Sequence, residues 1–246
     1  MSSVAIPTRA MVLAAGYGKR MGTLSDEKPK PLFDVHGKTL IDRAIDRLVE
    51  VGVTEAVVNL HHLGDQLRQH LKGRTDINLV FSDENEILDT GGGVAKALTH
   101  FDDAPFYVVN GDSLWLNSAE NALARLAARW NDAATDGVLL VHSTVEAYGY
   151  RGNGDFTVGP LGEITRKTEC EVAPYVFTGV QILHPRLFKD APTGKFSLNL
   201  LYDRAIEAER LFAVVHDGEW FHINTPEGLE AARSYMQTSY AEVRHR

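Results

Sequence analysis

Residues 11–20 read Met-Val-Leu-Ala-Ala-Gly-Tyr-Gly-Lys-Arg, a short apolar run that ends in a glycine-rich turn. This pattern is typical of a buried β-strand that leads directly into a loop. Glycine lacks a Cβ atom and tolerates unusual dihedral angles, so backbone N–H groups of such a loop can approach phosphate oxygens closely. The stretch predicts a strand followed by an anion-binding loop. For Gly16-Tyr17-Gly18 alone, a tight strand exit without a ligand is the alternative interpretation.

Strand and helix patterns alternate on both sides of this stretch. Apolar residues at helical spacing predict helices over 39–52, 64–71, 94–98, 118–130 and 198–208 and from 225 onward. Short apolar runs predict strands over 11–15, 56–60, 77–81, 106–109, 138–141, 176–183 and 211–215. Such alternation predicts an α/β fold with a Rossmann-like, mixed, mostly parallel sheet and helices on both faces. We expect one domain over residues 1–246, with a glycine-punctuated, substrate-facing elaboration at about 145–180.

The composition excludes several classes of protein. Of 246 residues, 33 are acidic and 25 are basic, which gives a net charge of −8. The chain as a whole therefore lacks the positive charge that attracts a nucleic-acid backbone. The single cysteine, Cys170, cannot form an internal disulfide or a thiolate zinc cage, which favours a reducing compartment. The apolar stretch over 10–15 is far shorter than the roughly 18 residues of a membrane span. We therefore expect a soluble, cytoplasmic protein that binds neither nucleic acid nor membrane.

The glycine-rich loop differs from two common phosphate-binding fingerprints. Met21 stands where the dinucleotide fingerprint has its third glycine. The Gly-Lys-Thr at 37–39 has Leu32 where a P-loop has its leading glycine. The continuation of the loop is more specific, because residues 20–32 read Arg-Met-Gly-Thr-Leu-Ser-Asp-Glu-Lys-Pro-Lys-Pro-Leu.

Residues 13–32 resemble the signature of the sugar-1-phosphate nucleotidyltransferases, Leu-x-x-Gly-x-Gly-x-Arg-Met-x-Pro-Leu-Thr followed by Pro-Lys-Pro-Leu. Thr23 and Ser25 depart from it, since the family usually has proline and threonine there. The resemblance covers almost the whole chain, with further matches at 84–93, 110–112, 148–149 and 220–227. Among subfamilies, the short length, the Thr-Gly-Gly-Gly at 90–93 and residues 175–179 are most similar to the bacterial N-acetylmuramate-1-phosphate uridylyltransferases.

This resemblance implies the nucleotidyltransferase fold and a reaction in which a sugar 1-phosphate attacks the α-phosphorus of a nucleoside triphosphate and pyrophosphate leaves. It favours UTP as the nucleotide and peptidoglycan recycling as the setting. A sugar phosphate has a second pKa near 6, so the nucleophile is largely a dianion at neutral pH and needs no general base. The reaction requires positive charge instead, so the resemblance implies Mg²⁺ as the cofactor.

In that reaction Arg20 and Lys30 are the expected catalytic residues. Arg20 can bind phosphate oxygens as a fork, and Lys30, between two prolines, can bridge the α-phosphate and the nucleophile. Outside this motif, an isolated Arg or Lys is normally a solvated surface residue. The resemblance implies nucleotide binding by Ala14, Ala15, Gly16, Gly18, Lys19, Arg20, Lys30, Thr90, Gly91, Gly92 and Asn110, and sugar binding by Gly149, Thr178 and Gly179. Lys19 can alternatively face solvent, and residues 90–92 can alternatively be a glycine-rich start of a helix.

Asp112 is the expected metal ligand. It follows a predicted buried strand, at the edge where α/β sheets collect ligands, and Mg²⁺ prefers oxygen ligands. The alternative is an Asp that caps a turn. The second metal carboxylate of the family would fall at His222, and the neighbouring glycine at Asn224, so the second ligand is open between these two residues. A neutral imidazole is a poor Mg²⁺ ligand. The alternative is that His222 packs beside Trp220 and that Asn224 only shapes the turn before Thr225.

Other functions compete with a uridylyltransferase. The near alternatives are a mannose- or heptose-1-phosphate guanylyltransferase and a glucose-1-phosphate nucleotidyltransferase. A nucleotide-sugar sensor without activity is kept open by His222, although a sensor has little need for Arg20, Lys30 and Asp112 together. A glycosyltransferase is disfavoured, because such folds typically hold their metal with Asp-x-Asp and residues 110–112 offer one carboxylate.

Overall fold

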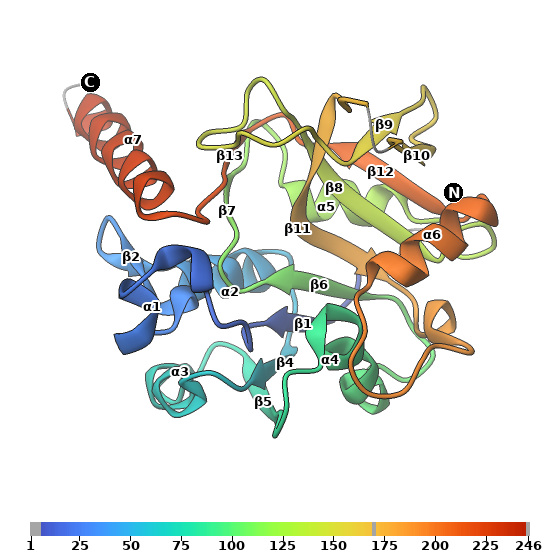
Figure 1. The fold of residues 1–246 in the computed structure, drawn as a ribbon, viewed down its shortest axis with the longest axis horizontal. Coiled ribbons are helices and arrows are strands. Elements are labelled where there is room, and N and C mark those ends of the chain that lie inside the picture. The colour runs from blue at the N-terminus through green and yellow to red at the C-terminus, as the bar shows by residue number, and fades with distance from the viewer. Residues whose placement is uncertain (1–5, 169–170, 245–246) are drawn as a thin grey trace.

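The computed structural model describes residues 6–168 and 171–244 and contains a nine-stranded sheet with helices on both faces (Figure 1). The strands of this sheet are β1 (Arg9–Leu13), β4 (Glu55–Leu60), β5 (Asn78–Asp83), β6 (Phe106–Asn110), β8 (Gly137–Ser143), β9 (Phe156–Val158), β10 (Ile164–Arg166), β11 (Tyr175–Leu183) and β12 (Leu211–Val215). Their order is β10-β9-β11-β6-β1-β4-β5, and β8 lies between β11 and β12. Cys170 lies outside the described residues.

The direction of the strands confirms the predicted α/β fold. β1 pairs in parallel with β4 and β6, β4 with β5, and β8 with β12. β11 is antiparallel to its neighbours β6, β8 and β9, and β10 is antiparallel to β9, so these two strands run against the other seven. The sheet is mixed and mostly parallel, as its alternating sequence pattern predicts.

The strand order creates a switch point at the carboxyl end of β1. From β1 the chain goes to β4 and β5 on one side and then returns to place β6 on the other side. Connections diverge at such a point and leave a crevice, which is where open α/β sheets bind ligands. The loops after β1 and β6 therefore meet over one opening.

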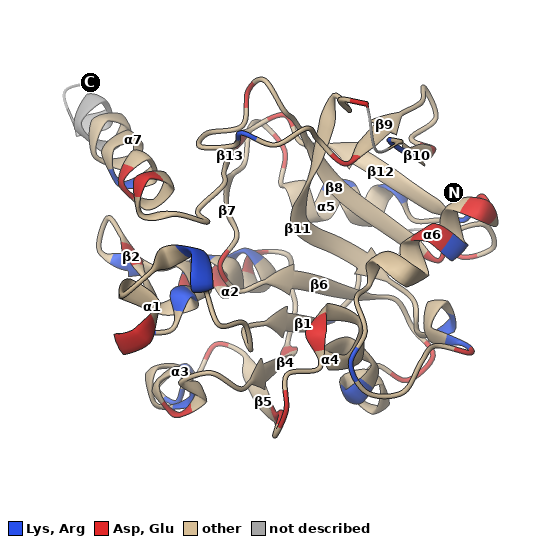
Figure 2. Ribbon diagram, in the orientation of Figure 1, with Lys and Arg blue, Asp and Glu red and all other residues tan. Residues whose placement is uncertain are grey.

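Two layers of helices cover the sheet, and a third group packs at one end. The helices are α1 (Leu24–Glu27), α2 (Leu40–Glu50), α3 (Gly64–Leu71), α4 (Asp89–Ala97), α5 (Ala122–Arg129), α6 (Asn199–Glu207) and α7 (Pro226–Arg244). One core joins α2, α3 and α5 to alternate strand residues such as Val12 and Val58, and the other joins α4 and α6 to Met11 and Val57. Figure 2 shows β6, β8 and β11 free of charged residues, as expected for strands buried on both faces.

Short elements extend this frame toward the site. Strands β2 (Asp34–Val35) and β3 (Lys38–Thr39) form a small hairpin, and β7 (Leu114–Leu116) pairs with β13 (Glu219–Phe221). The start of α7 packs through Leu229, Ala232 and Met236 on Met21, Phe33 and Phe221. This third core holds the glycine-rich loop, the segment after β6 and the segment before α7 together.

Two helix boundaries differ from the sequence expectations. The helix predicted from 118 begins at Ala122, because the Asn121 side chain caps it by accepting from the N–H groups of Leu123 and Ala124. The helix predicted from 94 begins at Asp89 and includes Gly91–Gly93. A Cβ on Gly91 would lie 2.3 Å from the Phe196 ring, so packing explains glycine inside this helix.

The stretch at 145–180 contains a hairpin formed by the antiparallel strands β9 and β10. β9 joins the main sheet at its contact with β11. None of the helices in the described residues is both long and apolar enough to cross a bilayer.

A capping variant tests how helix α2 begins. The Thr39 hydroxyl accepts from the Asp42 N–H, so Thr39→Ala should lower the free energy of unfolding by about 1 kcal/mol in urea titrations. Thr23→Ala is the matched control, because Thr23 occupies the N-cap of α1 without making a side-chain capping bond. Equal stability losses for both variants would contradict the capping role of Thr39.

Candidate functional site

Two adjoining cavities open at the switch point of the sheet. The first has a volume of about 300 Å³ and is lined by Leu13, Ala14, Ala15, Gly16, Gly18, Lys19, Arg20, Met21, Lys30, Pro31, Asn59, Glu84, Ile87, Asp89, Thr90, Asn110, Asp112 and Asn224. The second, of about 370 Å³, is lined by Arg20, Lys30, Asn110, Asp112, Ser113, Tyr150, Asp155, Val176, Phe177, Thr178, Gly179, Trp220, Phe221, His222, Ile223 and Asn224. The residues common to both are Arg20, Lys30, Asn110, Asp112 and Asn224. The cavities thus meet at two cations and one carboxylate.

The glycine-rich loop forms one wall of the first cavity. Gly18 and Gly22 have φ angles of 64° and 60°, in the left-handed region that favours glycine. Between them, Lys19–Met21 form a 3₁₀ turn. The buried Ser25 hydroxyl lies 3.0 Å from the carbonyl oxygens of both glycines. Ser25, which departs from the family pattern, therefore holds the loop closed with its hydroxyl.

Lys30 is the best-buried cation of the site. Its side chain is 9% exposed, and Nζ lies 2.5 Å from Asp112 Oδ2 and 2.7 Å from Asn224 Oδ1. Burial of a charge is costly unless the charge is paired and hydrogen-bonded, and here both conditions are met. Lys30 enters from a 3₁₀ turn (Lys30–Leu32) that follows Pro29. Lys30 and Asp112, which were predicted separately as a catalytic residue and a metal ligand, are thus in direct contact.

His222 and Asn224 lie at the back of this contact. The Asn224 Nδ2 atom is hydrogen-bonded to His222 Nε2. Burial of the ring, together with the nearby positive charges of Arg20 and Lys30, lowers the pKa of the His222 imidazole below its usual value. His222 is therefore neutral at neutral pH.

The oxygen atoms of the site fit a hard divalent cation. The Asp112 carboxylate and the Asn224 amide oxygen both face one position, which the Lys30 ammonium occupies. Oxygen ligands in small number suit Mg²⁺, which keeps several waters. Within residues 6–168 and 171–244 there is no cluster of three His, Cys, Asp or Glu side chains able to hold a metal.

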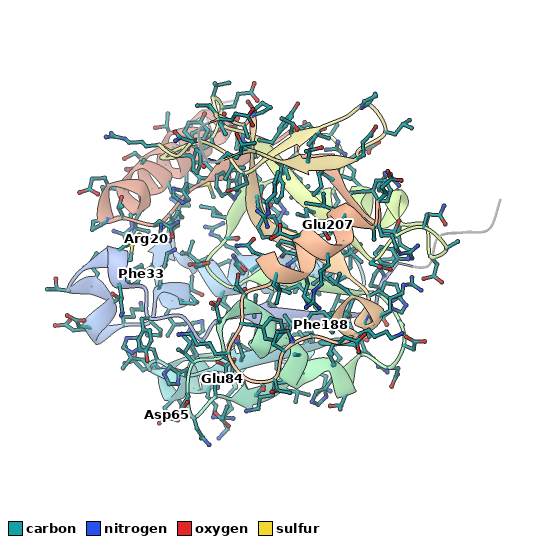
Figure 3. All side chains as sticks on the ribbon, turned by 45° about the vertical axis from the view of Figure 1, so that its right-hand side comes forward. Arg20, Phe33, Asp65, Glu84, Phe188 and Glu207 are labelled. Atoms are coloured by element: carbon teal, nitrogen blue, oxygen red, sulfur yellow. The ribbon has the colours of Figure 1, made fainter. Side chains whose placement is uncertain are left out.

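A buried polar network supports the first cavity, and its members were not predicted from the sequence. Asn59 Oδ1 accepts from the Ala14 N–H at 2.7 Å, and Asn59 Nδ2 donates to Glu84 Oε1 at 2.7 Å. Glu84 Oε2 in turn accepts from the Leu88 N–H at 2.9 Å. Asn59 and Glu84 are 3% and 5% exposed. The network ties the glycine-rich loop to the start of α4, and Figure 3 shows Glu84 below Arg20 on the same side of the molecule.

The glycines expected at a nucleotide base lie behind the cavity wall. The N–H groups of Gly91 and Gly92 both donate to the Phe196 carbonyl, at 2.9 and 3.1 Å. Thr90 lines the first cavity, and its hydroxyl oxygen accepts from the Leu198 N–H. Base recognition by these residues stays a prediction, and of the three only Thr90 lies on the cavity surface.

Of the three residues expected to bind the sugar, two lie on the surface of the second cavity and one does not. Thr178 and Gly179 line the second cavity, and the Thr178 carbonyl accepts from Ser113 Oγ and Trp220 Nε1. Gly179 has a φ of 83°, and a Cβ there would lie 2.5 Å from Ser113 Oγ. Gly149 is not among the lining residues, and a Cβ there would lie 3.3 Å from the His222 carbonyl oxygen, so this glycine packs against the segment that carries His222.

Comparisons with known proteins identify relatives of this chain. A model of the MobA-like NTP transferase domain matches residues 10–222. The N-acetylmuramate alpha-1-phosphate uridylyltransferase of Caulobacter vibrioides is 40% identical over 94% of this chain and 97% of its own. The protein of the same name from Neisseria meningitidis is 32% identical over 92% of this chain and 97% of its own. The crystal structure of HddC from Yersinia pseudotuberculosis complexed with GMP-PN shares the fold, with a TM-score of 0.74, 21% identity and coverage of 93% and 99% of the two chains.

Removal of the Asn59 amide tests the buried network. Asn59→Ala leaves the Ala14 N–H without its acceptor and Glu84 Oε1 without its donor, so the free energy of unfolding should fall by about 3 kcal/mol in urea titrations. Asn78→Ala, which removes an exposed amide bound to Glu55, should change it by less than about 0.5 kcal/mol. A tolerated Asn59→Ala would show that the network does not hold the loop.

Proposed function

Since the chain belongs to the MobA-like NTP transferase domain family, we propose that it is a uridylyltransferase that makes UDP-N-acetylmuramate and pyrophosphate from UTP and N-acetylmuramate 1-phosphate. The choice of nucleotide and sugar is supported by the names of the relatives from C. vibrioides and N. meningitidis, which match this chain over nearly their full length. We place the reaction in the cytoplasm and in peptidoglycan recycling, with Mg²⁺ as the cofactor.

The observation that carries the proposal is the meeting of two cavities at Arg20, Lys30 and Asp112. A transfer between two phosphates needs a separate cavity for each substrate and a shared boundary where they react. The first cavity, beside the glycine-rich loop, suits the triphosphate. The second cavity, whose lining includes Thr178 and Trp220, suits the sugar phosphate. Fixed cations lie at the boundary, where two anions must approach each other.

The reaction follows from these charges. The sugar phosphate is already a dianion and attacks the α-phosphorus in line, so no side chain has to remove a proton. Arg20 and Lys30 neutralise the phosphate charge that otherwise keeps the reactants apart, and they lower the energy of the more highly charged transition state. Asp112 and Asn224 would hold Mg²⁺, which supplies further positive charge to the phosphates. In the structure, the Lys30 ammonium contacts the same two oxygens, at the boundary between the cavities.

Loss of either cation should abolish most of the activity. With UTP, N-acetylmuramate 1-phosphate and Mg²⁺, the chain should release pyrophosphate, and Lys30→Ala and Arg20→Ala should lower kcat by roughly 10²-fold or more, because each removes charge stabilisation at the reacting phosphates. Lys28→Ala is the matched control, since Lys28 is an exposed lysine of the same segment. Unchanged turnover in both site variants would refute the assignment of catalytic residues.

A substrate panel separates the proposed reaction from its neighbours. UTP, dTTP, GTP and CTP are each tested with N-acetylmuramate, mannose, heptose and glucose 1-phosphates by pyrophosphate release. We expect the highest kcat/KM for UTP with N-acetylmuramate 1-phosphate. A preference for GTP with mannose or heptose 1-phosphate would replace the proposal by a guanylyltransferase. Binding of UTP in calorimetry without turnover of any pair would replace it by a sensor.

A further inference from the structure

We propose that Asn224 is the second protein ligand of the metal ion, that His222 orients it, and that Lys30 occupies the ion's position when no metal is bound. The inference rests on the proposed function, because it assumes that the reaction uses a divalent cation. It concerns residues at which this chain departs from the family pattern, which has a carboxylate at the position of His222.

The hydrogen bonds of Asn224 fix which way its amide points. The Lys30 ammonium carries donors and no acceptor, so the Asn224 atom at 2.7 Å from it must be the carbonyl oxygen Oδ1. The amide nitrogen then faces His222 Nε2, and this ring nitrogen must accept the hydrogen bond. The Asn224 side-chain oxygen therefore faces the position of the Lys30 ammonium, as does the Asp112 carboxylate.

The same contacts exclude His222 as a ligand. Nε2 accepts the hydrogen bond from the Asn224 amide, so the proton of the neutral ring is on Nδ1. Neither ring nitrogen then has a free lone pair for a metal ion. His222 is thus a positioning residue. It acts on the metal site as outer partners of metal ligands commonly do, by holding the ligand atom in place.

Lys30 marks the position of the ion. Its ammonium lies 2.5 Å from Asp112 Oδ2 and 2.7 Å from Asn224 Oδ1. These are the two oxygens that a divalent cation would use, so the ammonium and the ion compete for them. Binding of the ion requires Lys30 to leave both oxygens, which frees its charge for the phosphates. The free enzyme should therefore bind metal weakly until the nucleotide is present.

Mn²⁺ binding to the full chain tests the proposal without reference to turnover. Electron paramagnetic resonance of free Mn²⁺ gives the Kd, with and without a non-hydrolysable UTP analogue. With the analogue, Asn224→Ala and His222→Ala should each raise the Kd roughly tenfold. Asn224→Asp and the double variant His222→Ala/Asn224→Asp should bind at least as tightly as the unaltered chain, because either carboxylate oxygen can serve and no orienting partner is needed. Asn78→Ala should leave the Kd unchanged.

Lys30→Met gives the most specific result. Without the analogue it should lower the Kd for Mn²⁺ by roughly threefold or more, because it removes the competing charge while it keeps the length of the side chain. A merely structural role of Lys30 would give an unchanged or higher Kd. Retention of a cooperative thermal unfolding transition shows that each variant is folded.

Three results would overturn the proposal. Loss of Mn²⁺ binding in His222→Ala that Asn224→Asp does not rescue, with no effect of Asn224→Ala, would make His222 the ligand. Normal binding in both single variants would leave Asp112 and the nucleotide as the only ligands. An unchanged Kd in Lys30→Met would refute the competition. None of these results alters uridylyl transfer by the unaltered chain, so a failure here is distinct from a failure of the proposed function.

Discussion

The contact of the Lys30 ammonium with Asp112 and Asn224 is the interaction on which the site depends. Its three residues come from the segment after the glycine-rich loop, the end of β6 and the segment before α7. A cation that is 9% exposed is stable only if its partners stay in place, so this charge restrains three segments at once. Lys30 lines both cavities, so the shape of each cavity depends on the position of this one side chain.

The fold brings these segments together before any ligand binds. β1 lies between β4 and β6, so the loop after β1 and the turn after β6 lie side by side. Gly111 N–H donates to the Leu13 carbonyl at 2.8 Å, which fixes the turn that carries Asp112 against the end of β1. The core formed by α7, Phe33 and Phe221 then keeps the segment before α7 in place. Strand order and a short apolar contact thus position the charges.

The sequence predicts the local parts of this arrangement and misses the parts that depend on distant contacts. Arg20, Lys30 and Asp112 belong to contiguous motifs, so residue type and spacing identify them. Asn59 belongs to no motif, although a lone polar residue inside the apolar run at 56–60 was a visible signal. Glu84 begins the match at 84–93, but its hydrogen bond to Asn59 depends on a distant strand. The sequence offers a glycine-rich helix start at 90–92 only as an alternative, because the glycines at 91–93 suit a helix only when Phe196 packs over them.

The charges of the site explain how an acidic protein can bind two anionic substrates. The net charge of −8 repels phosphates at long range, so the attraction must come from Arg20 and Lys30 within the cavities. Asp112 is the one acid among the five residues shared by the cavities. A site with one carboxylate and two cations attracts a free divalent ion weakly and a triphosphate strongly. A divalent cation would therefore enter most favourably together with the nucleotide, whose phosphates carry additional negative charge.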